Sequence, residues 1–174
     1  MQFLVIIGLC VVASVAYGIA HDLVTAHVCV EYFTIGHPPV FATTDPIELA
    51  IGWGIIATWW VGAGLGIPLG LAAQAGSRPR RTPRSLVRPL AILMAIAGLS
   101  ALVAGTAGYA LARADILTLV GPIVDAVPAD RHTAFIADAC AHLASYGVGF
   151  FGGLILSIQV WRSRKATAVS PGST

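Results

Sequence analysis

The sequence predicts an all-α fold, an integral membrane four-helix bundle with both termini in the cytoplasm. Its 174 residues are 57% apolar and 10% charged, whereas about 25% of the residues of a soluble domain are charged. Four stretches are apolar over the length of about 20 residues that a helix needs to cross a bilayer. Basic and acidic residues gather at opposite ends of these stretches. The composition excludes an ordinary soluble enzyme and a disordered chain.

The predicted spans form one transmembrane domain of residues 1–165. They cover residues 3–20, 47–73, 86–111 and 134–161. The sequence leaves open whether the first helix continues to residue 34. The first segment could instead be a signal peptide cleaved after Ala20, but it lacks the basic residues that precede the apolar core of such peptides. The tail, residues 166–174, is predicted to be disordered.

Eight of the ten basic residues lie in two segments that the predicted spans place on one side of the membrane. They are Arg78, Arg80, Arg81, Arg84, Arg88, Arg162, Arg164 and Lys165. By the positive-inside rule this side is the cytoplasm. We interpret both segments as topology anchors beside anionic lipid, and no other feature of the sequence indicates nucleic-acid binding.

The second predicted span carries a stripe of small residues at intervals of four. The stripe consists of Gly54, Thr58, Gly62, Gly66 and Gly70. Small residues at this spacing let another helix approach closely. The partner helix can belong to the same chain or to a second copy, so a homo-oligomer is one hypothesis. Pro68 is expected to kink or interrupt the helix.

Polar side chains concentrate at the predicted extracytoplasmic end, where all five histidines and all eight acidic residues lie. Two segments repeat the same offsets of zero, six and ten. They are His21, His27, Glu31 and His132, Asp138, His142. At about 100° per residue, each set falls within one arc of about 120° on a helix.

The first and last spans are expected to run antiparallel. Residues of the two sets that lie at the same depth relative to the membrane can then face each other. The expected pairs are His21 with His142, His27 with Asp138, and Glu31 with His132. Imidazole and carboxylate suit iron, copper or zinc, and helix bundles often hold such ligands in their cores. We therefore predict that these six residues supply the ligands of a divalent or redox transition metal. They spread over about 15 Å along the helix axis, so the expectation is two nearby ions that use most of them, or one ion that uses the middle four. The alternative is a network of hydrogen bonds and ion pairs without a metal.

Four other residues are assigned supporting positions around this predicted site. Tyr17 and Tyr146 lie one helical turn deeper than His21 and His142, where a tyrosine can donate a hydrogen bond to a metal ligand. Asp22 points about 100° away from His21 and is expected to support a ligand or to be solvated. His37, before two prolines, is a possible loop ligand.

Two of the three cysteines, Cys29 and Cys140, lie toward the same end of the chain. A disulfide between them is conceivable in an oxidising compartment. We favour free thiols that pack as small hydrophobic residues.

Three motifs carry a resemblance to known sequences. They are His21-Asp22-x2-Thr25-x3-Cys29-Val30-Glu31-Tyr32-Phe33-Thr34, Ala129-Asp130-Arg131-His132-x2-Phe135 and Ala141-His142-x2-Ser145-Tyr146. They resemble a family of uncharacterised bacterial membrane proteins, which implies a bacterial cytoplasmic (inner) membrane and no mechanism. The pair Asp138-x3-His142 is similar to a ligand pair of copper membrane monooxygenases, but the further histidine expected downstream is absent.

The leading functional hypothesis is a metal-dependent oxidoreductase that acts on a lipid or quinone-like substrate entering from the bilayer. A hydrolase that uses metal-activated water would need the same ligands. The alternatives are a metal carrier, a sensor or an assembly subunit without catalysis. A bundle that binds one haem between His21 and His142 is a further alternative.

Overall fold

The computed structural model describes residues 1–164, and all its regular elements are helices. The predicted disordered tail lies outside these residues. The elements are α1 (Gln2–Val28), α2 (Val30–Thr34), α3 (Pro46–Ile56), α4 (Trp59–Gln74), α5 (Pro83–Arg113), α6 (Ile123–Ala126), the 3-10 turn η1 (Ala129–Arg131) and α7 (His132–Ser163). No strand is present in the described part of the chain, so the predicted all-α class is confirmed.

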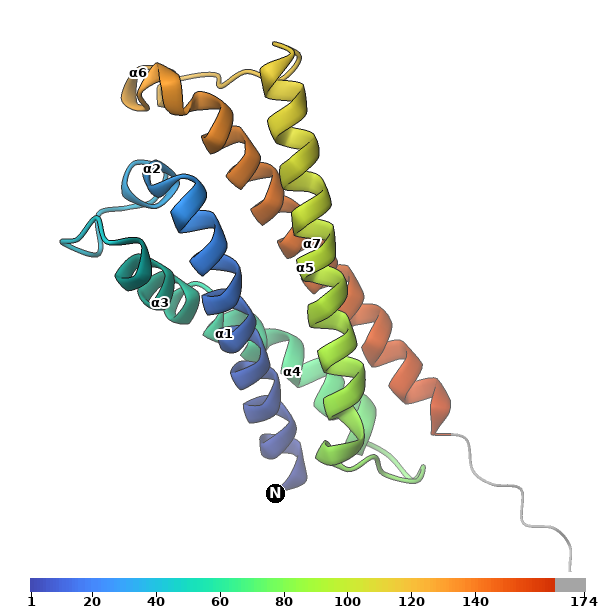
Figure 1. Cartoon of the computed structure of the whole chain (residues 1–174). Coiled ribbons are helices and arrows are strands. Elements are labelled where there is room, and N and C mark those ends of the chain that lie inside the picture. The colour runs from blue at the N-terminus through green and yellow to red at the C-terminus, as the bar shows by residue number, and fades with distance from the viewer. Residues whose placement is uncertain (165–174) are drawn as a thin grey trace, which may run out of the picture.

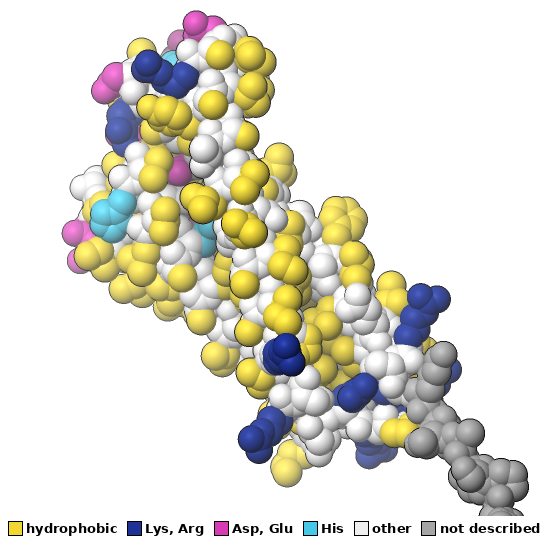
Figure 2. Space-filling view, turned by 45° about the vertical axis from the view of Figure 1, so that its right-hand side comes forward, with side chains coloured by type: hydrophobic (Ala, Val, Ile, Leu, Met, Phe, Trp, Pro, Cys, Tyr) yellow, Lys and Arg dark blue, Asp and Glu magenta, His cyan; other side chains and the backbone are white. Residues whose placement is uncertain are grey.

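Four helical segments are long and apolar enough to cross a membrane. They are α1, α3 together with α4, α5, and η1 together with α7. Many of their large apolar side chains point outward, such as Val12 at 66% exposure and Leu102 at 65%. Figure 2 shows hydrophobic side chains over the middle of the visible face, Lys and Arg mostly at its lower end, and Asp and Glu at its upper end. The surface thus has the apolar middle and polar ends that suit a bilayer.

The helices associate in two groups, as Figure 1 shows. In one group α1 packs against the consecutive helices α3 and α4, and in the other α5 packs against α7. Contacts between α4 and α7 and between α1 and α5 join the two groups. We call the end with α2, α6 and the start of α7 the acidic end, and the end with the 75–82 loop and the end of α7 the arginine end.

The second apolar segment is interrupted at Ala57 and Thr58. The sequence placed the interruption at Pro68, but α4 runs through that proline as a continuous helix. The Thr58 hydroxyl donates a hydrogen bond to the carbonyl oxygen of Gly54. The close crossing with α1 lies at this break, since a Cβ on Gly54 would stand 2.6 Å from the backbone nitrogen of Ile19.

The small-residue stripe of α3 and α4 faces α1 of the same chain along its length. A Cβ at Gly62 would lie 2.7 Å from the Cys10 carbonyl oxygen, and one at Gly66 would lie 3.0 Å from the Ile7 Cα. The expected close helix approach is therefore made within the chain. The homo-oligomer stays a prediction.

Gly62→Ala is expected to destabilise the bundle. The new methyl group would meet the backbone of Cys10 and Val11, at 2.7 and 2.8 Å, and such overpacking costs about 1–3 kcal/mol. Gly64→Ala is the matched control, because no atom lies within 4 Å of a Cβ there and alanine favours a helix by about 1 kcal/mol over glycine. Melting temperatures in one detergent compare them. Equal melting temperatures for the two variants would contradict the described packing of α1 on α4.

The arginine end is closed by a single buried side chain, Arg164, which is 1% exposed. Its guanidinium donates to four backbone carbonyl oxygens, those of Ala72, Ala75, Arg78 and Pro79. Ala72 and Ala75 lie at the end of α4, where helix carbonyls lack partners of their own. Arg164 therefore joins the end of α7 to the end of α4 and to the loop that follows it.

Candidate metal centre

The structure brings two histidines and one aspartate together inside the bundle, near its acidic end. His21 and Asp22 come from the last two turns of α1, and His142 comes from α7. One ligand atom from each of the three residues lies within 4.8 Å of the other two. Asp22 and His142 are buried, and His21 is half-buried. We call these three residues the histidine–aspartate triad.

The hydrogen bonds of His142 fix which ring nitrogen is free. Its Nδ1 lies 2.9 Å from the carbonyl oxygen of Asp138, and a carbonyl only accepts, so Nδ1 carries the proton. In a neutral ring Nε2 then presents its lone pair, 3.4 Å from Oδ1 of Asp22. Two acceptors that face each other in a buried place need a cation or a proton between them.

His21 completes the triad with an unsatisfied nitrogen. Its ring centroid lies 4.5 Å from that of His142, edge to face, as the depth pairing of α1 with α7 predicted. Its Nε2 is buried and has no hydrogen-bond partner among residues 1–164. The ring stacks on Tyr17, whose hydroxyl lies 2.7 Å from the Ser145 Oγ. Tyr17 therefore contacts His21 through its ring, while its hydroxyl contacts Ser145 and makes no hydrogen bond to a triad residue.

A short helix covers the triad on the side of the acidic end. The chain leaves helical geometry at Cys29, with φ −150° and ψ 91°, and resumes as α2. This turn brings Tyr32 onto His142, with ring centroids 4.4 Å apart, and Phe33 against the same ring at 5.8 Å. Phe135 of α7 packs on Tyr32 in turn. Aromatic side chains therefore separate the triad from the end of the bundle.

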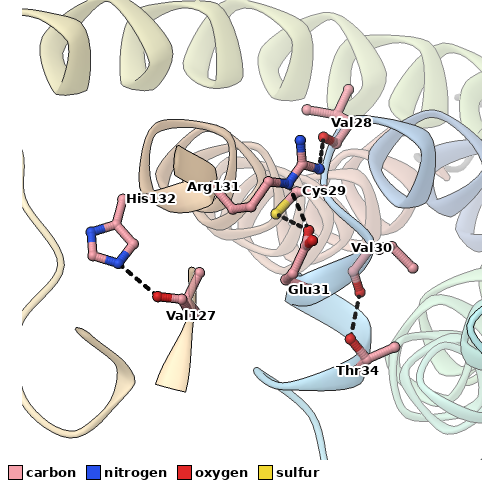
Figure 3. Close-up of polar contacts among 8 residues, drawn as sticks. All are labelled: Val28, Cys29, Val30, Glu31, Thr34, Val127, Arg131 and His132. Carbon is pink, nitrogen blue, oxygen red and sulfur yellow. Dashed lines mark hydrogen bonds and ion pairs between the residues drawn. The ribbon is translucent and has the colours of Figure 1, made fainter. Parts of the chain in front are cut away.

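An ion pair holds α2 against the start of α7, as Figure 3 shows. Arg131 donates from Nε to the Glu31 carboxylate at 3.0 Å and from Nη2 to the Val28 carbonyl oxygen at 2.9 Å. A continuous helix would satisfy that carbonyl with the Tyr32 N–H, but the Tyr32 N–H donates to Cys29 instead. Arg131 thus replaces the hydrogen bond that the break removes.

Loss of the Glu31 charge is expected to loosen α2. Burial tends to raise the pKa of Glu31, but hydrogen bonds from its own backbone and from Arg131 hold it below its usual 4.5. A carboxyl with a lowered folded pKa stabilises the folded state above pH 4.5, and this contribution is lost as the pH falls through the folded pKa. Glu31→Gln at pH 7 should therefore raise amide exchange in residues 30–34 a few-fold, because exposed ion pairs contribute about 0–1 kcal/mol.

The matched control for that experiment is Glu48→Gln. Glu48 is an exposed acid in the first turn of α3, with no ion-pair partner among the described residues. Wild-type exchange in residues 30–34 should likewise rise at low pH after correction for the intrinsic rate. If Glu31→Gln leaves the exchange of α2 unchanged, the ion pair does not hold this helix.

Four of the six predicted ligands lie outside the triad, and three of these have other polar partners. His27 is exposed, and its Nδ1 lies 2.6 Å from the Leu23 carbonyl oxygen of its own helix. Glu31 pairs with Arg131, and the Nε2 of His132 lies 2.9 Å from the Val127 carbonyl oxygen (Figure 3). The structure therefore does not assemble these residues with His21 and His142.

Asp22, Tyr146 and His37, which were expected in supporting positions, differ in how they relate to the triad. Asp22, expected beside a ligand or in solvent, is itself in the triad. Tyr146 is 48% exposed, with its ring centroid 6.1 Å from that of His142. The Nδ1 of His37 lies 2.8 Å from the Tyr32 carbonyl oxygen, and its ring packs on Trp53. His37 is therefore part of the covering layer.

Asp138, the remaining predicted ligand, lies one helical turn before His142. It is 2% exposed, and its Oδ2 has no hydrogen-bond partner among residues 1–164. The only group of three metal-ligating side chains found in the described chain does not include it. Its backbone carbonyl nevertheless orients His142.

The cysteines are free thiols in the structure. Burial is the largest cause that raises the pKa of Cys29, to about 11, so this thiol is protonated at neutral pH. Its Sγ donates to the Glu31 carboxylate at 3.4 Å. The preference for free thiols over a Cys29–Cys140 disulfide agrees with the structure.

Two cavities of about 610 Å³ each adjoin the triad. One lies between α1, α5 and α7, and the other is lined by residues of α1, α3, α4, α5 and α7, with Ala57 and Thr58. Tyr17 and His21 line both cavities, and His142 lines the second. Both cavities are otherwise lined mostly by apolar residues, so they lead from apolar surroundings to the two histidines of the triad, whereas Asp22 lines neither cavity.

Comparisons with protein-family models, with curated proteins and with solved structures find no match to this chain. The resemblance of its motifs to bacterial membrane proteins therefore stays a prediction.

Proposed function

We propose that this chain is a metal-dependent oxidoreductase of a bacterial cytoplasmic membrane, with its acidic end on the extracytoplasmic side. The triad of His21, Asp22 and His142 would hold the metal. The observation that carries the proposal is the convergence of two imidazoles and one carboxylate, from two helices, within 4.8 Å. The arginines at the opposite end support the orientation.

The donor set favours a redox metal with open coordination positions. Two histidines and one carboxylate are the ligand set of non-haem iron oxygenases, and copper and zinc also accept imidazole and carboxylate. When bound, iron or copper would supply one-electron chemistry. Asp138 orients His142 through its carbonyl, and such partners of a ligating histidine strengthen metal binding.

The surroundings of the triad favour a substrate from the bilayer. Tyr32 and Phe33 cover His142 toward the acidic end, while both adjoining cavities are largely apolar. A lipid or quinone-like molecule can reach such a place without crossing water. Apolar surroundings also lower the local dielectric constant, and this strengthens the electrostatic interactions of a bound ion with its ligands.

Metal analysis and an absorption spectrum test the proposal. The protein should be purified in mild detergent, without a chelator and without an added His tag. We expect about one equivalent of iron or copper, from a triad that offers one site. Protein that is metal-free and fails to bind added Fe²⁺, Cu²⁺ or Zn²⁺ would leave His142 and Asp22 as an ion pair. A Soret band in the same spectrum would instead support the haem hypothesis.

A metal carrier, sensor or assembly subunit is the second candidate for the same site. This candidate also predicts bound metal, but not turnover. Reduction or oxidation of the bound metal by a quinol or quinone in the membrane distinguishes the two. A metal whose redox state no quinone changes would favour the second candidate.

A further inference from the structure

The cavity between α1, α5 and α7 has an unusual polar feature. It is lined by apolar and small residues, among them Ala20, Val24, Gly98, Leu102 and Gly105. Val24 is 63% exposed and Leu102 is 65% exposed on its rim. We call this cavity the side groove, because these rim residues lie on the face that would contact lipid.

The described chain has two buried side-chain polar atoms that lack a hydrogen-bond partner, Oδ2 of Asp138 and Nε2 of His21. Both residues line the side groove. A buried polar atom without a partner costs about 1–3 kcal/mol, so it needs a partner that the chain itself does not provide. Asp138 is the stronger indication, since it is 2% exposed and lies outside the triad.

We propose that the side groove binds an amphiphile with a hydroxyl head group and a hydrocarbon tail, with the hydroxyl at Asp138. A hydroxyl donates to a carboxylate and accepts from a carboxylic acid, so it fits either protonation state of Asp138. A carbonyl can only accept, and an ammonium can only donate. The apolar residues along α1 and α5 then receive the tail.

The inference rests on the proposed function in one respect, namely that an amphiphile in the side groove would be a substrate of the proposed metal centre. His21 belongs to the triad and also lines the side groove with Asp138. A head group at Asp138 would therefore lie beside the proposed metal. The second cavity is also lined by His21, but Asp138 lines the side groove alone.

Photolabelling tests the inference. The probe is hexadecanol with a diazirine in its chain, added to the purified full-length protein in detergent, and labelled peptides are identified by mass spectrometry. The control probe is the corresponding hexadecane without a hydroxyl. We expect the alcohol to label groove residues of α1 and α5 about tenfold more than the alkane, which is the effect of one good hydrogen bond.

Two pairs of variants separate the head group from the groove. Asp138→Ala should lower labelling by the alcohol about tenfold, while Asp138→Asn, which still donates and accepts, should retain most of it. Ala20→Phe should block the groove from its rim. Ala16→Phe is its control, because Ala16 is also exposed on α1 but lines neither cavity at the triad.

Equal labelling by the two probes would overturn the inference, and so would labelling that neither Asp138→Ala nor Ala20→Phe reduces. Metal content measured on the same samples separates this result from the proposed function. Labelled protein that binds no metal would reject the metal site alone. Metal-loaded protein without groove labelling would reject the amphiphile alone.

Discussion

Replacing His142 by alanine should lower bound metal from about one equivalent to less than about a tenth, the loss of affinity expected when a triad loses one of three ligands. The ring offers Nε2 because Nδ1 donates to the Asp138 carbonyl oxygen. Among the described residues, His27, His37 and His132 do not belong to the group of ligating side chains that contains His142. Metal analysis after identical purification measures the effect.

His27→Ala is the matched control for that variant. His27 was predicted as a ligand on the same grounds as His142, but it is exposed and lies outside the triad. It should keep the wild-type metal content. If both variants lose metal equally, metal binding also depends on predicted ligands outside the triad. If neither loses metal, the triad is not the site.

The fold could be predicted from the sequence because its signals are long. A bilayer span is a run of about 20 apolar residues, and each of the four runs is interrupted by few polar groups. The finer features depend on contacts between helices. The break at Thr58 and the continuous helix through Pro68 are set by the crossing of α1 with α3 and α4, which hydropathy does not report.

The candidate site could be predicted only in part. His21 and His142 share a depth on antiparallel helices, and the offsets were enough to pair them. The same offsets failed for Glu31, because the extended residue Cys29 ends α1 and rotates α2 toward Arg131. Asp22 was assigned a supporting position from its angle to His21, but α1 has neighbours on two sides, so adjacent residues can both face protein.

The arginine segments illustrate the same limit. The sequence interpreted Arg162 and Arg164 alike, as charges that fix the orientation of the chain. The structure distinguishes them, because Arg162 is exposed and Arg164 is 1% exposed, with its guanidinium on four backbone carbonyl oxygens. The Cζ atom of that guanidinium also lies 5.4 Å from the centroid of the Trp161 ring. Only the contacts of the 75–82 loop reveal this difference.

Arg164→Ala should therefore destabilise the protein strongly, whereas Arg162→Ala should not. The first substitution leaves the carbonyl oxygens of Ala72 and Ala75 at the end of α4 without their donor, and each buried unsatisfied group costs about 1–3 kcal/mol. Arg164→Lys should recover little of the lost stability. The compact ammonium of lysine lacks the planar fork of donors with which the guanidinium reaches four carbonyl oxygens. The melting temperature in detergent and protease cleavage within residues 75–82 measure the effect. Since both alanine variants remove one positive charge from the same end, equal losses would mean that net charge, and not the buried hydrogen bonds, stabilises this end of the bundle.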